Sequence, residues 1–312
     1  MAFQILADEA VEEAVQRIAR EQIDKAVDEI NDRELDRHET VHQVRKRCKK
    51  IRGLIRLVRP QFEDTYDREN AWYRDSARPL SYVRDAQSII ETFDKLLDHF
   101  DDQIDRAAFA AVRQQLTDRR KHVAEDQVGL DKRLNEFLER MHEGRDRIAA
   151  WQLSKKGFKA VQGGLTMTYA RGYQAMADAY QKPNTENFHE WRKRAKYHWY
   201  HMRLLRPVWP GPIKARCDEA DLLSDDLGGD HDLAVLYETL LEGPLEVDGE
   251  ETIQALLGLI TQRQVELRAK TKRLGARLYA EPPKRFAKRL RGYWDAWQSS
   301  MEAEPQTTQP KS

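Results

Sequence analysis

The sequence is poor in the residues that interrupt helices, cross-link a chain or anchor it in a membrane. Of 312 residues, 15 are glycine, 11 are proline and two are cysteine, whereas 34% are charged. Long charged segments with few helix breakers are typical of all-helical proteins. No apolar run is long enough to span a bilayer, and nothing near the N-terminus resembles a signal peptide. We therefore expect an all-α protein in the cytoplasm that makes no membrane contact.

The two cysteines, Cys48 and Cys217, do not have the spacing of a metal-binding or redox motif. Both fall in segments with helical periodicity, as expected for a reduced protein without disulfides. We predict that the protein carries no cofactor.

Positive and negative charges are equal in number but unevenly distributed. Residues 1–40 hold twelve acids and five lysines or arginines, whereas residues 41–60 hold eight lysines or arginines and no acid. This segregation favours an enclosed basic site over a surface made for general nucleic-acid binding.

Apolar residues recur with helical spacing along almost the whole chain. The pattern predicts helices over 7–30, 38–59, 68–99, 103–141, 155–181, 185–206, 211–242, 250–280 and 283–299. Prolines mark the breaks between several of them. The end of the chain, residues 302–312, has the composition of a disordered tail.

An internal repeat dominates the sequence. The segments VHQVRKRCKKIRGLIRLVRP (41–60) and FHEWRKRAKYHWYHMRLLRP (188–207) align without a gap at an offset of 147 residues. The same offset places Asp85 on Asp232. We therefore predict two four-helix-bundle repeats, 1–147 and 148–301, related by a pseudo-twofold axis and forming one domain.

The first copy also contains the H-E-x-x-H pattern of zinc peptidases, at residues 38–42. Two histidines four residues apart share a helix face, as zinc ligands do. In the second copy, however, Thr185 replaces His38, and only His42 has a histidine counterpart, His189. No third ligand follows at a usable spacing, and the next turn is cationic. We predict no metal site and no catalytic residues.

The repeated helices each have an apolar stripe and a basic stripe. The predicted apolar stripes are Val41, Val44, Cys48, Ile51, Ile55 and Val58, and Phe188, Trp191, Ala195, His198, Met202 and Leu205. The predicted basic stripes are His42, Arg45, Lys46, Lys49, Arg52 and Arg56, and His189, Arg192, Lys193, Lys196 and Arg203. Like charges one turn apart destabilise a helix by about 0.2–0.5 kcal/mol per pair. A solvated face normally mixes acids with such cations, so two unrelieved basic stripes indicate a polyanion site. A solvated face, or one neutralised by acids of the N-terminal helix, is the alternative.

Mixed arginine and lysine suit a flexible chain of phosphates, because arginine offers a planar fork and lysine a mobile point charge. Base recognition would add exposed aromatic or amide side chains among the cations. The first stripe has none, although the second has Tyr200 and, at its edge, Trp199. Nucleic acid is therefore the less favoured ligand.

The chain resembles the CHAD family, the conserved histidine α-helical domain. The resemblance rests on V-H-x-x-R-K-x-x-K-K-x-R (41–52), F-H-x-x-R-K-x-x-K-Y-x-x-Y (188–200), L-S-x-x-R-D (80–85), L-G-x-x-H-D (227–232) and LYAEPPKRF…GYWDAW (278–297). It implies two helical bundles around a basic central groove that binds inorganic polyphosphate, often at polyphosphate granules. The E-x-E-x-K signature of a triphosphate-tunnel domain is absent, so the chain resembles a stand-alone binding module.

The resemblance implies the following polyphosphate-binding residues: His42, Arg45, Lys46, Lys49, Arg52 and Arg56 on one wall of the groove, and His189, Arg192, Lys193, Lys196, Tyr200 and Arg203 on the other. Arg78 is a further candidate, while Asp85 and Asp232 are predicted to orient groove cations. The second copy departs from the first at two positions. Trp199 corresponds to Arg52, and Tyr197 corresponds to Lys50. Fewer direct phosphate contacts are therefore expected there.

We thus predict a non-enzymatic polyphosphate-binding protein, with other polyanions as further candidate ligands. One alternative is an enzyme that transfers or hydrolyses phosphate of polyphosphate or nucleotides, with His42 or His189 as phosphoryl acceptor. Its weakness is that the stripes contain no carboxylate cluster and no phosphate-transfer motif. The other alternative is a single-stranded nucleic-acid binder.

Overall fold

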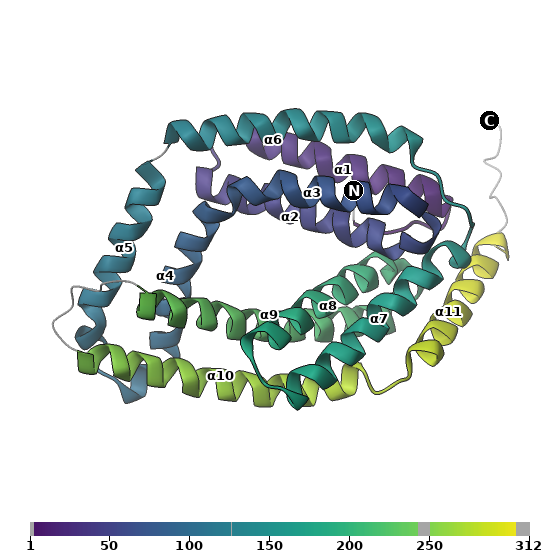
Figure 1. The fold of residues 1–312 in the computed structure, drawn as a ribbon. Coiled ribbons are helices and arrows are strands. Elements are labelled where there is room, and N and C mark those ends of the chain that lie inside the picture. The colour runs from purple at the N-terminus through teal and green to yellow at the C-terminus, as the bar shows by residue number, and fades with distance from the viewer. Residues whose placement is uncertain (1–2, 126, 243–249, 304–312) are drawn as a thin grey trace, which may run out of the picture.

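The computed structural model describes residues 3–125, 127–242 and 250–303. Every regular element in these residues is helical, which confirms the predicted all-α class. The long helices are α1 (Val11–Asn31), α2 (Arg37–Leu57), α3 (Glu63–Ala77), α4 (Ser81–His99), α5 (Ala110–Glu125), α6 (Gln127–Arg147), α7 (Phe158–Gln181), α8 (Thr185–Leu204), α9 (Pro210–Glu242), α10 (Glu250–Leu278) and α11 (Pro283–Ala303) (Figure 1). None of the helices in these ranges is long and apolar enough to cross a membrane.

Two predicted helices are wrong in extent. The predicted helix 68–99 is interrupted by a 3-10 turn, Arg78–Leu80, because Pro79 has no N–H to donate and restricts the residue before it. The predicted helix 103–141 is also wrong in extent. Its place is taken by two short 3-10 turns, Asp101–Gln103 and Arg106–Phe109, and then by the two helices α5 and α6. At the other end, α11 continues to Ala303, two residues into the predicted tail, and residues 304–312 lie outside the described residues.

The order of elements follows the 147-residue offset in the first part of each predicted repeat. The offset carries α1, α2 and the start of α3 close to α7, α8 and the start of α9. It also carries the 3-10 turn Arg59–Gln61 onto Arg206–Val208, and both turns have proline at their second position. The pseudo-twofold axis and the boundary between residues 147 and 148 remain predictions.

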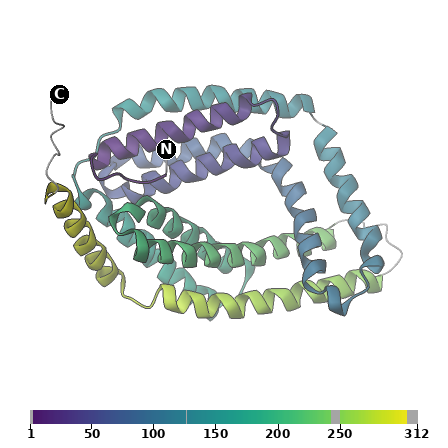
Figure 2. The same cartoon turned by 180° about the vertical axis from the view of Figure 1, so that it is seen from behind.

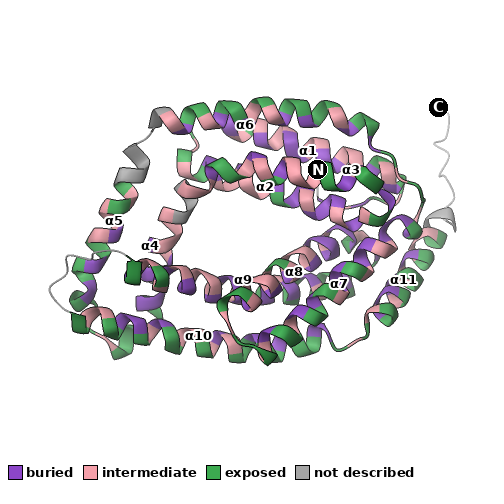
Figure 3. Cartoon of the chain, viewed as in Figure 1, coloured by how far each residue is buried: buried purple, intermediate pink, exposed green. Residues whose placement is uncertain are grey.

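The buried residues form two clusters that do not follow this boundary. The larger cluster contains residues of α1, α2, α3 and α6 together with residues of α7, α8, α9 and α11. The smaller cluster joins α4 and α5 to the C-terminal part of α9 and to α10. Purple segments in Figure 3 run along the inner faces of these helices. Because burying a large apolar side chain contributes about 1.5–3 kcal/mol, the larger cluster holds the two predicted repeats together.

Helices α2 and α8 begin at side-chain caps and are anchored by the predicted apolar stripes. The Asp36 carboxylate accepts from the N–H groups of His38 and Glu39, and the Asn184 side chain accepts from the N–H of Asn187. Every residue predicted for either apolar stripe is at most 2% exposed, which confirms both stripes. The basic stripes are thereby turned away from the core.

Helices α2 and α8 lie near the middle of the molecule and pack against each other. Helix α1 covers α2 on one side, and α9 runs alongside α8 on the other. Figure 2 shows the same arrangement from behind. This packing places the two basic stripes on neighbouring helices.

Candidate anion-binding site

The contact between α2 and α8 is made by a glycine and a tyrosine at matching positions of the repeat. A Cβ atom on Gly53 would lie 2.9 Å from Cδ2 of Tyr200, so only glycine admits this approach. The next residue of α8, the buried His201, donates from Nε2 to the Gly53 carbonyl oxygen over 3.2 Å. A position that meets its own counterpart is expected where two repeats are related by a twofold axis. Gly53 therefore serves packing rather than ligand approach.

Several cations of the α2 stripe are held by neutral groups. Arg45 donates from Nη1 to the carbonyl oxygen of Ala77 over 3.1 Å, and Arg52 donates from Nε to the side-chain oxygen of Asn70 over 3.1 Å. Within the described ranges, Lys46 and Arg52 have no carboxylate within ion-pair distance. The neutral acceptor of Arg52 orients its side chain, and the positive charges of Lys46 and Arg52 stay unpaired among the described residues.

Arg56 lies at the C-terminal end of the α2 stripe, against α8. Its guanidinium carbon is 4.1 Å from the ring centre of Tyr197 and 5.8 Å from that of Tyr66. The Nε atom is buried without a hydrogen-bond partner in the described part of the chain. Aromatic faces hold a guanidinium by its charge while leaving its in-plane N–H groups available to an anion.

The α8 stripe differs because acids lie close to its cations. Lys193 pairs with Glu190 on the same helix at 2.5 Å, and Lys196 pairs with Asp221 at 3.4 Å and Asp225 at 3.6 Å, both on α9. These contacts lower the net positive charge of the middle of α8.

Arg192, His189 and His231 form a second cluster between α8 and α9. The rings of His189 and His231 are 4.0 Å apart, centre to centre, and both Nδ1 atoms are buried without a hydrogen-bond partner among the described residues. Burial lowers the pKa of both histidines to about 4, with Lys193 and Arg192 adding to the effect. Gly228 leaves room for Arg192, whose Nε would lie 3.3 Å from a Cβ there. At neutral pH this cluster therefore offers one arginine and two uncharged imidazoles.

The structure places the aromatic residues of α8 differently from the expectation. Tyr200 is 3% exposed, with its ring against Gly53 and Phe3, and does not lie on an open basic face. Trp199 is flanked by Lys196 and Arg203, whose charged groups lie 3.9 and 4.8 Å from its ring centre. The spacing of apolar residues along α8 could not reveal the burial of Tyr200, because Gly53 and Phe3 are distant from it in the sequence.

The outlying candidates are distributed around the N-terminal half of α2. Arg78 is exposed and lies 3.4 Å from Asp75, directly after Ala77, whose carbonyl oxygen accepts from Arg45. His42 is half-buried and Lys49 is exposed on α2. The Asp85 side chain lies outside the described residues, whereas Asp232 lines a pocket with Arg192. The structure thus brings Arg78 near Arg45.

The pocket beside Arg192 has a volume of about 450 Å³ and lies between α4, α8, α9 and α10. Its cations are Lys95, Arg192, Lys196 and Arg263, and its acids are Asp225, Asp226 and Asp232. The mixture makes this pocket close to neutral. Lys95 and Arg263 are absent from the predicted site because they lie outside the repeated segments.

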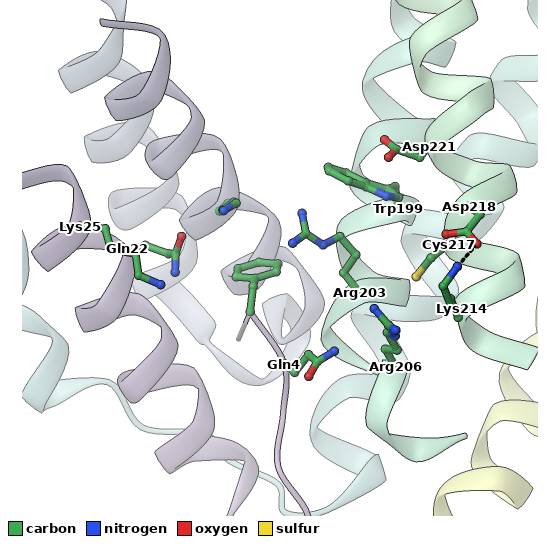
Figure 4. Close-up of a pocket in the computed structure, with 12 residues that line it drawn as sticks. Gln4, Gln22, Lys25, Trp199, Arg203, Arg206, Lys214, Cys217, Asp218 and Asp221 are labelled. Carbon is green, nitrogen blue, oxygen red and sulfur yellow. Dashed lines mark hydrogen bonds and ion pairs between the residues drawn. The ribbon is translucent and has the colours of Figure 1, made fainter. Parts of the chain in front are cut away.

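A second pocket, called here the N-terminal pocket, has a volume of about 570 Å³ (Figure 4). Its charged lining residues are Lys25, Lys50, Arg203, Arg206, Lys214, Asp218 and Asp221. Only Arg203 among them was predicted. Lys50 belongs to the basic run in the sequence, but it lies outside the predicted basic stripe and has a tyrosine, Tyr197, as its counterpart.

No group of three or more histidine, cysteine or acidic residues able to hold a metal is present in residues 3–125, 127–242 and 250–303. His38 lies at the first turn of α2, where its backbone N–H donates to Asp36. The histidines of the zinc-like pattern thus take part in a capped helix start and in the basic stripe.

The sequence model of the CHAD domain family matches residues 17–241, which is more than half of the chain. The chain therefore belongs to the CHAD domain family, as its motifs predicted. Among solved structures, it is similar to the crystal structure of the CHAD domain from the plant Ricinus communis, with a TM-score of 0.64. The two chains are 16% identical, and the similarity covers 90% of this chain and 96% of the plant chain. A comparison with curated proteins finds no match.

Proposed function

We propose that the protein binds inorganic polyphosphate along the cations of α2 and α8, without catalysing a reaction. One observation carries this proposal. Lys46, Arg52 and Arg56 of α2 and Arg192 and Arg203 of α8 have no carboxylate within ion-pair distance among the described residues, although the two helices pack against each other. Arginines and lysines gathered without counter-charges repel one another. A polyanion removes that repulsion when it binds.

The physical basis is counterion release. A polyphosphate chain carries a charge on each phosphate and holds a layer of cations, which are freed when lysine and arginine replace them. Arg52 and Arg56 supply planar forks for phosphate oxygens, while Lys46 supplies a charge that can follow a flexible chain. Affinity should fall by about 50-fold between about 50 and about 200 mM salt if four phosphates are contacted.

The aromatic side chains favour polyphosphate over single-stranded nucleic acid. Stacking on a base needs an open aromatic face, and each stacked base contributes about 1–3 kcal/mol. The ring of Tyr200 is buried against Gly53, and the ring of Trp199 has Lys196 and Arg203 close to it. A ligand made of phosphates alone needs no such face.

The test is a titration of the full chain with long polyphosphate and with single-stranded RNA at low and at moderate salt. A variant with Arg45, Lys49, Arg192 and Lys196 each replaced by glutamate should lose binding of long polyphosphate. A matched control replaces four exposed lysines away from α2 and α8, Lys132, Lys155, Lys156 and Lys159, with glutamate, and should keep most of the affinity. Equal losses in the two folded variants, or tighter binding of RNA at the same salt, would contradict the proposal.

Absence of catalysis has its own test. Release of phosphate from polyphosphate, or transfer of labelled phosphate to His42 or His189, would identify the protein as an enzyme and contradict a purely binding function. Polyphosphate granules are the proposed place of action. A fluorescent fusion of the chain should colocalise with them, and the four-glutamate variant should not.

A further inference from the structure

The N-terminal pocket is lined by a largely buried lysine that the proposed function does not use. Lys50 is 7% exposed and lines the pocket, with its Nζ atom 5.8 Å from the ring centre of Phe3. Within the described residues it has no ion pair and no hydrogen-bond partner for Nζ. A buried lysine is normally paired with an acid, because an isolated charge is costly to remove from water. Lys50 is therefore an exception that calls for a chemical explanation.

The charges around Lys50 are mostly of its own sign. Lys46 and Arg47 lie on the same helix, Lys25 on α1 and Arg203 on α8. Burial and these cations lower the pKa of Lys50 to about 7, so much of the amine is neutral at neutral pH. An exposed lysine, with a pKa near 10.4, has only about four neutral amines in ten thousand at pH 7. Neutral amines are the nucleophilic form of lysine.

The same pocket also offers a place for a phosphate group. Arg203 extends from α8 into the pocket, and Arg206 lies below it at the end of the same segment (Figure 4). Neither arginine has a carboxylate within ion-pair distance in the described ranges. Lys214, by contrast, is paired with Asp218 at 2.5 Å, and Asp221 faces Lys196. Two arginines are thus available to hold phosphate oxygens beside the Lys50 amine.

The other nucleophile of the pocket is inactive. Cys217 lines the same cavity, and burial raises the pKa of its thiol to about 12. A thiol reacts through its thiolate, which is scarce under these conditions. With a volume of about 570 Å³, the pocket admits a small phosphate compound as well as water, which occupies about 30 Å³ per molecule in the liquid.

We propose that Lys50 is a site of acylation by acyl phosphates, which the N-terminal pocket binds through their phosphate group. The neutral amine nitrogen attacks the carbonyl carbon, and a C–N bond forms. The bond between the carbonyl carbon and the phosphate oxygen breaks, and phosphate leaves with the bonding electron pair. The nitrogen loses one proton to the departing phosphate or to water, so the products are an amide and inorganic phosphate. No oxidant or reductant is needed.

Acylation would also change the proposed polyphosphate site, and this consequence rests on the proposed function. Lys50 lies one turn from Lys46 and near Arg203, both candidate phosphate ligands. A bound polyanion should favour the protonated form of Lys50, whereas an amide cannot take up that proton. Acylated protein should therefore bind polyphosphate a few-fold more weakly, by an amount that corresponds to the loss of about one contact.

Acetyl phosphate is the probe, added to the full-length chain at neutral pH, with peptide mass spectrometry to follow each lysine over time. Exposed Lys132, which has no ion pair in the described residues, is the internal reference. Lys50 should be acetylated at least about tenfold faster than Lys132, because its neutral fraction is far larger while its intrinsic nucleophilicity is lower. Equal or slower acetylation of Lys50 would overturn the proposal.

A second measurement separates a phosphate-binding pocket from a merely reactive amine. Arg206→Met should slow acetylation of Lys50 by acetyl phosphate several-fold and leave its acetylation by an uncharged acetyl ester unchanged. Added inorganic phosphate should slow the reaction with acetyl phosphate at Lys50 and not at Lys132. A preference for Lys50 that is the same for both reagents and insensitive to Arg206→Met would overturn the assignment of acyl phosphates. None of these readouts requires polyphosphate, so their failure is distinguishable from failure of the proposed function.

Discussion

Helices α2 and α8 have nearly the same pattern of cations but different electrostatic surroundings. On α2, Arg52 donates to an amide oxygen, and neither Lys46 nor Arg52 has a carboxylate within ion-pair distance among the described residues. On α8, Lys193 and Lys196 lie within ion-pair distance of acids, Glu190 on the same helix and Asp221 and Asp225 on α9. A repeated sequence therefore yields two unequal halves of the candidate site. We infer that α2 is the stronger half for binding a polyanion.

The largest expected effect comes from reversing charge on α2. Lys46→Glu with Arg52→Glu should weaken polyphosphate binding by about 100-fold at low salt, which corresponds to about 2.7 kcal/mol. Lys193→Glu with Lys196→Glu should weaken it by only about tenfold, because these lysines are already partly neutralised. Titration of labelled polyphosphate, with Lys132→Glu and Lys159→Glu as the charge-matched control, measures both. A larger loss from the α8 pair would reverse the ranking of the two helices.

Acidification should act through the histidines of α8 and α9. Burial lowers the pKa of His189 and His231 to about 4, that of His201 to about 3, and that of His198 well below its ordinary value of 6.5. Between about pH 6.5 and pH 4 the unfolded chain takes up protons that the folded chain excludes. The free energy of unfolding therefore falls as pH falls through this window, by at most about 1.4 kcal/mol per pH unit for each histidine.

Urea unfolding at a series of pH values measures this dependence. We expect a loss of about 2 kcal/mol or more between neutral pH and pH 4.5 or so, with the summed histidine contribution setting the slope. The His201→Gln variant should show a shallower slope than the unmodified chain, because it has one fewer excluded proton. A flat profile through this window would show that these histidines are accessible to protonation in the folded state.

A smaller effect is expected where the two helices meet. Gly53→Ala places a methyl group 2.9 Å from the Tyr200 ring and should destabilise the fold by about 1–3 kcal/mol, as overpacked cores do. Gly258→Ala is the matched control. Its Cβ meets no atom within 4 Å among the described residues, and alanine suits the interior of α10 better than glycine by up to about 1 kcal/mol. The midpoint of thermal unfolding should therefore fall for Gly53→Ala and rise for Gly258→Ala. A rise for Gly53→Ala would contradict the packing role of Gly53.

The smallest effect is expected from removing acids beside α8. Asp221→Asn with Asp225→Asn removes the acids that face Lys196 and should make α8 more like α2. Polyphosphate affinity should rise by about two- to fivefold at low salt, and the gain should fade as salt is added. Asp64→Asn with Asp102→Asn, two exposed positions away from α8, makes the same change in net charge and should have little effect. Equal gains from both pairs would point to net charge alone.

The helical class, the apolar stripes and most helix ends followed from local rules that act within a few residues. Period-3.6 apolar spacing identified Val41 and Trp191 as core positions, and both are fully buried. Helix interruption at Pro79 also has a local cause, yet the apolar pattern on either side of it predicted one continuous helix. The division of the core into two clusters depends on how α4 and α5 pack against α9 and α10, which no local pattern reports.

The cations of the candidate site were predictable from the sequence, but the acids and aromatic rings that surround them were not. The repeat identified Arg56 and Arg203 as basic positions, because the residue sequence alone specifies which side chains are cationic. Asp221 lies 25 residues from Lys196, and only the packing of α9 on α8 brings the two within 3.4 Å. Tyr200 was expected on the basic face and is buried, because α2 presents a glycine there and lets the helices approach closely.

By itself, the sequence determined the all-helical class, the family and the two basic stripes, since helical periodicity and repeated motifs are properties of residue order. Only the tertiary structure decided which cations are paired with acids, which aromatic rings are buried and where a pocket opens beside Lys50. Those outcomes depend on side chains that meet from distant segments, and Coulomb and burial energies are set by distances in space. Lys50 shows the difference most clearly. In the sequence it is one more cation of a basic run, and in the fold it is a largely buried lysine that lines a pocket.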